Sequence, residues 1–232
     1  MKRIVLLAFL LLLGKTTFAQ VVETTVYDDG RVYTGQRDAK GKINGKGLMI
    51  WPNGDRYDGY WKKGIMHGEG TYTYAAAGYS YSGEWKKGEI KGHGVFKFAN
   101  GNMMEGDWTD MGTGTGYMLM ADGTRYDGPF VNGRFQGSGI LVWTNGNRYE
   151  GTFVDGHMQG YGTLKMANGE EYKGMMSNDR REGNGTVVYP DGSNYEGEWH
   201  NDLPNGRGKY INAQGEEFVG QFIDGNFVPP DE

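Results

Sequence analysis

Hydrophobic and polar positions alternate along this chain with a period of two, in short runs bounded by glycines. Tyr57, Gly59 and Trp61 form one such run, and more polar residues separate them. A second run of the same kind extends from Gly68 to Tyr74. Strict alternation over short runs is typical of β-strands, whereas no segment has the helical period over a length that would cover a sheet. We therefore expect an all-β protein.

The alternation recurs in a frame of about 23 residues, which is the signature of a repeat protein. Each copy holds an opening Tyr, a Gly two residues later, a Gly-x-Gly pair and a turn that ends in Gly. The opening positions are Tyr33, Tyr57, Tyr81, Met104, Tyr126, Tyr149, Tyr172, Tyr195 and Phe218. Units this small cannot bury a hydrophobic face alone, so they must stack on one another.

Asn-Gly and Asp-Gly pairs such as Asn53-Gly54 and Asp191-Gly192 favour tight hairpin turns between the strands. Alternation places the opening Tyr, the glycines and the large residue four positions after the Tyr on one face. Glycine in a strand costs conformational entropy, so its regular use indicates that a neighbouring group approaches the backbone closely. We expect aromatic rings to lie flat over these glycines.

The first nineteen residues form a separate segment. Lys2 and Arg3 precede ten apolar residues, Ile4 to Leu13, and small or polar residues follow up to Gln20. This pattern predicts a secretory signal peptide over residues 1–19, cut before Gln20, with an uncleaved N-terminal anchor as the alternative. Residues 20–232 then form one β domain. We expect an exported protein in the periplasm, on the cell surface or outside the cell, in a bacterial envelope.

The amino-acid composition excludes several classes of site and partner. The chain has no cysteine, which excludes disulfide scaffolds, cysteine-based zinc sites and thiol nucleophiles. Asp and Glu outnumber Lys and Arg by 29 to 24, and a cleaved leader would remove three of the basic residues. Because neutralisation of phosphates supplies most non-specific affinity for nucleic acids, we expect no nucleic acid partner.

The repeats resemble MORN motifs (membrane occupation and recognition nexus). Residues 81–94, Tyr-Ser-Gly-Glu-Trp-Lys-Lys-Gly-Glu-Ile-Lys-Gly-His-Gly, carry the resemblance most clearly. It extends over about eight repeats from residue 33, with a partial unit at each end, and the fourth repeat departs from the pattern around Met111–Gly116. The resemblance implies an elongated, single-layer antiparallel meander of stacked β-hairpins, similar to a solenoid. It also implies an adaptor that binds proteins or phospholipid.

The sequence contains few residue patterns that are typical of catalytic or metal-binding sites. The four histidines occupy four different positions of the frame, so stacking does not gather them, and we expect neither a metal nor a cofactor. No Gly-x-Ser-x-Gly motif occurs, and the Gly-x-Gly pairs precede strands instead of opening helices, so they are not phosphate loops. We expect no enzyme activity. The alternative is a hydrolase that binds envelope polysaccharide through aromatic side chains.

We therefore predict a non-enzymatic binding or scaffold protein of the cell envelope, with an unidentified protein or envelope component as its partner. Its groove of glycine and aromatic residues would recognise protein, a lipid headgroup or a glycan. The densest cluster of aromatic and cationic residues is the candidate binding site, and it would suit an anionic membrane surface. This site comprises Tyr57, Trp61, Lys62, Lys63, Tyr81, Trp85, Lys86 and Lys87.

Overall fold

The protein is described from a computed structural model, which covers residues 3–5 and 22–229. The chain divides into two compact units, unit 1 (Met1–Gly114) and unit 2 (Thr115–Glu232). Most of the predicted signal peptide and its cleavage point lie outside the described residues, so both remain predictions. Within the described ranges every regular element is a strand, and no helix there could cross a membrane.

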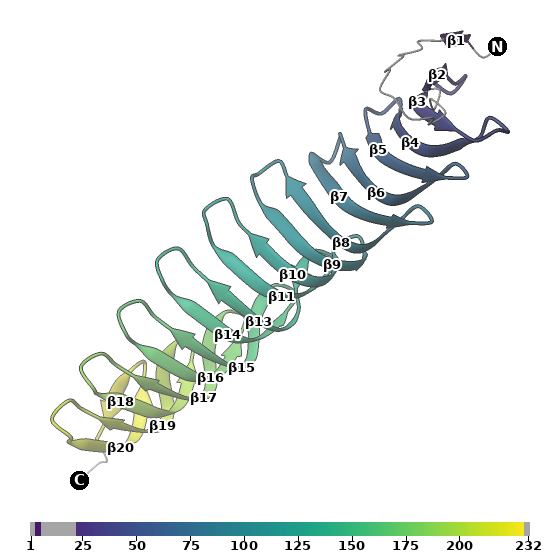
Figure 1. Cartoon of the computed structure of the whole chain (residues 1–232). Coiled ribbons are helices and arrows are strands. Elements are labelled where there is room, and N and C mark those ends of the chain that lie inside the picture. Colours follow the sequence, from purple (N-terminus) through teal and green to yellow (C-terminus); the bar gives the residue numbers. More distant parts are fainter. Residues whose placement is uncertain (1–2, 6–21, 230–232) are drawn as a thin grey trace, which may run out of the picture. The chain divides into compact units, whose positions relative to one another are not determined.

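From Glu23 onward, unit 1 is built from successive strands joined by short turns (Figure 1). Its strands are β1 (Arg3–Val5), β2 (Glu23–Val26), β3 (Val32–Arg37), β4 (Ile43–Ile50), β5 (Arg56–Lys62), β6 (Ile65–Tyr74), β7 (Tyr79–Lys86), β8 (Glu89–Phe98) and β9 (Met103–Asp110). The next strand, β10 (Thr113–Leu119), contains the division between the units. This division falls in the fourth repeat, where the sequence departs from the frame.

Unit 2 continues with the same alternation of strand and turn. Its strands are β11 (Arg125–Val131), β12 (Arg134–Phe135), β13 (Gly137–Val142), β14 (Arg148–Val154), β15 (His157–Lys165), β16 (Glu171–Ser177), β17 (Arg180–Val188), β18 (Asn194–His200), β19 (Leu203–Ile211), β20 (Glu217–Ile223) and β21 (Asn226–Val228). In both units neighbouring strands are antiparallel. The predicted all-β meander of stacked hairpins is confirmed.

A line of directly paired glycines crosses the strands of each unit, and we call it the glycine column. In unit 1, Gly47 pairs with Gly59, Gly59 with Gly70 and Gly70 with Gly83. In unit 2 the column runs through Gly139, Gly151, Gly162, Gly174, Gly185, Gly197, Gly208 and Gly220. In each of the two units, the paired glycines of successive hairpins therefore form a bare strip of backbone.

The opening tyrosines lie over this strip, as the sequence predicts. A Cβ added at Gly94 would lie within 2.6 Å of the Tyr81 ring and hydroxyl, so the ring fills the space a side chain would need. The hydroxyls of the opening tyrosines bond to their own strands. In the repeat of Tyr172, for example, the hydroxyl donates to the Met175 carbonyl at 2.8 Å. Both tyrosines are buried, with at most 1% of their surface exposed. The rings and the glycines are thus one packing unit.

Tryptophans complete the aromatic core. The indole N–H of Trp61 donates to the Gly47 carbonyl at 2.8 Å, and that of Trp108 donates to Gly94 at the same distance. The Trp85 ring stands edge-on to Tyr57 and Tyr81, with both centroid separations at 5.4 Å. Edge-to-face contacts of this kind add stability beyond the burial of area. One layer of strands can therefore hold a core made of its own interlocking rings.

The turns differ from the prediction in one respect. The tight two-residue turns lie at Lys63-Gly64 and its equivalents, where both residues have positive φ. At Asn53-Gly54 only the glycine does, and the Trp51 N–H bonds to the Asp55 carbonyl around three turn residues. The Asn53 side chain accepts the Asp55 N–H at 3.0 Å, which accounts for asparagine there without a left-handed backbone.

One partly buried ion pair interrupts the apolar core of unit 2. Arg181 lies opposite Met176 on the neighbouring strand. In the preceding repeat the position of Arg181 is held by Met158. The Arg181 guanidinium lies 4.6 Å from the Trp199 ring centroid and 2.8 Å from the Glu170 carboxylate. The two charged side chains are only 21% and 18% exposed, so each depends on the other.

We expect Arg181→Met to lower the free energy of unfolding by about 2 kcal/mol, because it leaves the Glu170 carboxylate half-buried without its cation. The double variant Arg181→Met/Glu170→Gln should recover most of that loss, since methionine is the residue this place accepts in the preceding repeat. Chemical denaturation of the wild type and both variants measures the difference. Equal stability of the single and double variants would show that the pair has no energetic coupling.

Candidate functional site

The four aromatic rings of the predicted site lie in the core of unit 1. Tyr57 and Tyr81 are fully buried, and Trp61 and Trp85 retain 6% and 4% of their exposure. Their polar atoms are bonded to backbone: the Tyr57 hydroxyl donates to the Tyr60 carbonyl, and the Trp85 indole donates to a glycine carbonyl. These rings hold the repeats together, and they leave little surface for a ligand.

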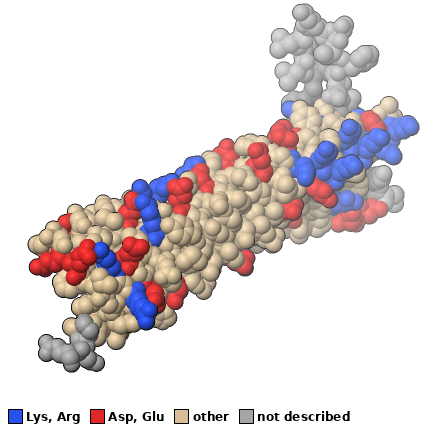
Figure 2. All heavy atoms as spheres, turned by 90° about the horizontal axis from the view of Figure 1, so that it is seen from below, with Lys and Arg blue, Asp and Glu red and all other residues tan. Residues whose placement is uncertain are grey.

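The four lysines of the predicted site are exposed at the hairpin turns. Lys63 and Lys87 are left-handed turn residues, with φ of 53° and 55°. The two turns are tied to neighbouring strands, since the Gly88 N–H donates to the Met66 carbonyl at 2.9 Å. In unit 1 the site is therefore split into a buried aromatic part and an exposed edge of four ammonium groups, which pair with no carboxylate among the described residues. Figure 2 shows the basic side chains of this unit gathered on the surface.

Aromatic side chains are accessible at another place, a cleft of about 750 Å³ in unit 2. Strands β18 to β21, the turn before β18 and the turn before β21 supply its walls. We call it the aromatic cleft. It is lined by Tyr189, Pro190, Asp191, Ser193, Tyr195, Pro204, Tyr210, Phe218, Phe222, Gly225, Asn226 and Phe227.

The cleft exists because the ring-on-ring packing thins out over these strands. Tyr195 still has two edge-on neighbours, Trp199 at 5.3 Å and Phe222 at 4.9 Å between centroids. Among the described residues, the rings near the next opening position, Phe218, are the more distant ones of Tyr210 and Phe227, at 6.0 and 5.7 Å between centroids. Phe218 is half-buried, whereas the preceding opening tyrosines are buried. The rings of Tyr189, Tyr210, Phe218 and Phe227 are therefore only half-buried where they line the cleft.

The polar atoms at the mouth of the cleft are suited to a polar backbone. The hydroxyls of Tyr189 and Tyr210 bond to no other described residue. Burial raises the pKa of Tyr189, so its hydroxyl stays protonated at neutral pH and can donate. The Ser193 hydroxyl and N–H hold the pKa of Asp191 below its usual range, which keeps that carboxylate charged. The cleft thus combines apolar walls with two donors and one anion.

The sequence analysis places Phe218 among the opening positions of the repeats, but it did not predict the cleft. Tyr210 follows the same frame, two residues after a Gly-x-Gly pair, and could have been found. Phe227 lies beyond the last complete repeat and has no counterpart there. Its ring would be 3.0 Å from a Cβ at Gly220, so it covers the glycine that a tyrosine covers in other repeats.

In the part of the chain that the structure describes, no group of three or more His, Asp or Glu side chains is placed to hold a metal ion. His93 lies beside Glu105 and Asp107, whereas His157 and His200 each have one different carboxylate neighbour. The histidines are therefore separate, as their different places in the repeat predict. These pairs are exposed, and each would supply little more than a surface ion pair.

Two solved structures of one domain are similar to this chain. The TCP10 domain of Danio rerio CPAP in complex with a peptide of Danio rerio STIL is 15% identical, with a TM-score of 0.50, over 88% of this chain and 96% of that chain. A mutant of the same domain is 16% identical with a TM-score of 0.48, over 84% and 96%. At these identities the likeness concerns the fold alone. No curated protein matches the chain.

The family model of the MORN repeat matches seven segments. They are residues 39–56, 57–76, 81–103, 126–148, 149–171, 172–194 and 195–217. The unmatched stretch between 103 and 126 is the fourth repeat, which lacks its opening tyrosine and contains the division between the units. The matched segments make up more than half of the sequence, and they are the hairpins whose glycine column and tyrosines form the core. The chain therefore belongs to the MORN-repeat family.

Proposed function

We propose that this protein is a non-enzymatic scaffold that binds an extended, proline-rich segment of a partner protein in the aromatic cleft of unit 2. The cleft is the single observation that carries the proposal, because it is where the aromatic core of the repeats is open to a ligand. A MORN-repeat protein with a binding role is consistent with this, and so is the peptide complex of the similarly folded TCP10 domain.

The chemistry of the cleft favours a polyproline II segment over a helix or a charged chain. Such a segment has no internal hydrogen bonds and presents its carbonyls outward, while its proline rings fit slots between aromatic side chains. The hydroxyls of Tyr189 and Tyr210 are the donors that those carbonyls require. Asp191 would pair with a basic residue that flanks the prolines. Because the segment is ordered before it binds, little conformational entropy is lost.

The test is a titration of the protein with short synthetic proline-rich peptides that carry one flanking arginine, with glycine-substituted peptides of equal length as the comparison. We expect saturable binding by the proline-rich series alone. The variant Tyr189→Phe/Tyr210→Phe keeps both rings and removes both hydroxyls, and it should bind roughly tenfold more weakly, since two hydrogen bonds are lost. Tyr60→Phe, an exposed tyrosine of unit 1, is the matched control.

Absence of saturable binding, or equal binding by the double tyrosine variant, would contradict the proposal. Binding of the glycine-substituted peptides with the same affinity would also contradict it, because it would remove the role of the proline rings.

We further propose that the scaffold works outside the cytoplasm, in the envelope of a bacterium. The sequence of residues 1–19 supports this, and comparison of the N-terminus of the mature protein with the encoded one tests it. A mature chain that begins at Met1 would contradict cleavage before Gln20.

Contact with an anionic membrane is a second proposal, supported by the exposed ammonium groups of Lys62, Lys63, Lys86 and Lys87. Since the neighbouring rings are buried, the attraction would be electrostatic and sensitive to salt. Flotation with anionic vesicles tests it. A variant with all four lysines changed to glutamate should not float, and flotation of this variant at low salt would contradict the proposal.

A further inference from the structure

Unit 2 carries a second recess, of about 710 Å³, on the face opposite the aromatic core. Its floor is the glycine column at Gly185, Gly197, Gly208 and Gly220. A Cβ on any of these glycines would point toward an aromatic residue of the core, as at Gly185, where it would meet the Tyr172 ring. The other side of the same backbone strip therefore faces solvent. We call this recess the polar groove, and it is distinct from the aromatic cleft.

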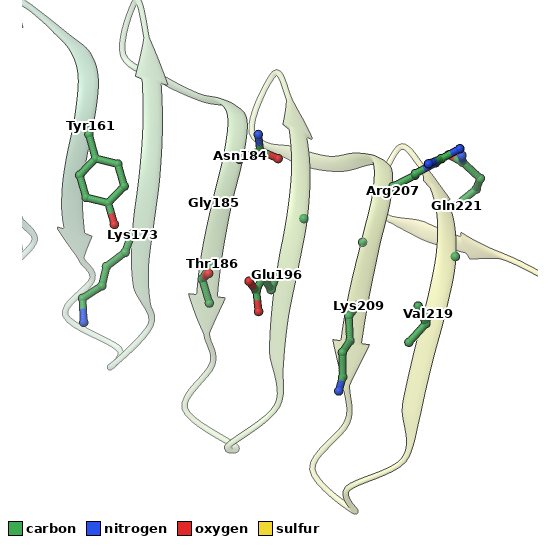
Figure 3. A pocket seen from close by; sticks show the side chains of 13 residues that line it. Tyr161, Lys173, Asn184, Gly185, Thr186, Glu196, Arg207, Lys209, Val219 and Gln221 are labelled. Carbon is green, nitrogen blue, oxygen red and sulfur yellow. The ribbon is translucent and has the colours of Figure 1, made fainter.

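The groove is bounded by the side chains on either side of the glycines (Figure 3). Asn184, Arg207 and Gln221 stand along one wall. Thr186, Glu196, Lys209 and Val219 stand along the other. The strand register sets this arrangement, because Asn184 and Thr186 flank Gly185 while Arg207 and Lys209 flank Gly208. The result is a straight channel across several strands, with an apolar floor and polar walls.

Most of the wall groups are available to a ligand. The side chains of Asn184, Thr186, Glu196, Arg207 and Gln221 bond to no other described residue. At one end of the groove the ring of Tyr161 extends toward Lys173 (Figure 3), and 64% of this tyrosine is exposed. An exposed aromatic ring beside a floor of bare backbone forms a flat surface, which is unusual in the middle of a charged face.

A peptide strand does not fit this floor. In a sheet the N–H and C=O groups of each strand bond to its neighbours, and Gly185, Gly197 and Gly208 all lie within the paired ladder. A peptide in the groove therefore could not form the main-chain hydrogen bonds that give β-strand addition its affinity. Only side chains can donate or accept there.

The charges do not favour a polyanion. Arg207, Lys173 and Lys209 line the groove, but the last two are paired with Glu171 and Glu217, the Lys209 pair at 2.7 Å. Glu196 adds a free negative charge between them. With positive and negative groups interspersed, neither nucleic acid nor an anionic lipid surface gains a net attraction.

We infer that the polar groove binds an uncharged, linear polysaccharide chain that lies along the glycine column. A sugar ring has an apolar face of C–H groups and a rim of hydroxyls. The face matches the glycine floor and the Tyr161 ring, and the hydroxyls match the amide, carboxylate and guanidinium groups of the walls. Strands lie about 4.8 Å apart, so an extended glycan would meet a similar pair of wall positions at each strand it crosses. This binding site goes beyond the proposed protein scaffold.

Unit 1 provides an internal control, because it has a recess of the same kind over Gly59, Gly70, Gly83 and Gly94. Its walls are dominated by Asp58, Glu69 and Glu84. Tyr60 also lines this recess, at a different position of the repeat from Tyr161, and the Lys46 ammonium lies 5.1 Å from its ring centroid. The ammonium therefore lies over the Tyr60 ring, of which 44% is exposed, whereas 64% of Tyr161 is exposed.

The experiment screens the intact protein against an array of soluble neutral polysaccharides, followed by titration with oligosaccharides of increasing length from those that bind. Polygalacturonate and a glutamate-rich peptide are the charged comparators. We expect binding to at least one neutral glycan, tightening with chain length and insensitive to salt. Tyr161→Ala should weaken it at least roughly tenfold, as should Arg207→Ala/Gln221→Ala, while Tyr60→Ala leaves it unchanged.

Tyr161 is exposed, so its replacement should leave the thermal unfolding curve of the protein unaltered. Failure to bind any neutral polysaccharide, stronger binding of either charged comparator, or an equal effect of Tyr60→Ala would each overturn the inference. The proline-rich peptides would bind other residues, on the face of the aromatic core. Failure of one proposal would therefore not contradict the other.

Discussion

The variant Gly83→Val is expected to lose about 3 kcal/mol of unfolding free energy, near the upper end of what overpacking costs. A Cβ at Gly83 would lie 2.5 Å from both the Gly94 Cα and the His93 carbonyl oxygen, and 2.6 Å from the Tyr81 hydroxyl. Two of these obstacles are backbone of the paired strand, which cannot rotate away. Accommodation therefore requires the strands to separate and the tyrosine to leave the glycine column.

Urea denaturation of wild type and variant measures this loss. The control is Ser80→Val, which adds the same residue to the same strand on the polar face and should change stability by less than about 0.5 kcal/mol. Since stacked repeats couple mainly to their neighbours, amide exchange should rise first in β7 and β8. Equal stability of the Gly83 variant and wild type would show that the glycine column is not required for close packing.

Raising the pH is expected to unfold the protein in a steep transition between about pH 10 and 12. Burial raises the pKa of Tyr81 to about 12, and it does the same for Tyr126, Tyr149 and Tyr195. The unfolded chain ionises near pH 10, whereas the folded chain keeps these protons. The stability from these phenols is fully present below pH 10 and is lost as the pH rises toward the folded value.

Each tyrosine of this kind contributes at most about 1.4 kcal/mol per pH unit within that window, and several act together. Total stabilities are small by comparison, so the fold should not persist to pH 12. Parallel measurements of tyrosinate absorbance and circular dichroism should give coincident transitions. Tyr81→Phe should make the transition less steep. Gradual ionisation of the buried tyrosines while the β-structure persists would contradict the packing described here.

The sequence predicts the strands and the tyrosine-glycine packing well, because both follow from a period that recurs across the chain. Glycine recurs at the positions of Gly59 and Gly83 in repeat after repeat, so the sequence alone indicates that a ring packs closely against the backbone there. The turn types were less predictable. The Asn-Gly pairs predict two-residue hairpin turns, yet it is Lys63-Gly64 that has this backbone. Lysine is not a residue that predicts such a turn.

The candidate site was harder to predict, because alternation identifies which residues share a face but not what covers that face. Trp61 and Trp85 look like a binding surface in the sequence, whereas rings on adjacent strands bury them. The aromatic cleft depends on where that coverage stops, which is a property of the last repeats together. Phe227, outside the frame, could not have been placed without the structure.

The most direct test of the central claim, that ligand contact occurs at the aromatic cleft and not at the buried rings of unit 1, is chemical-shift mapping of the aromatic side chains. The protein would be titrated with the proline-rich peptide that binds best. We predict that Tyr189, Tyr210 and Phe227 shift, while Trp61 and Trp85 do not. Shifts centred on the two tryptophans, with the cleft unchanged, would contradict the account.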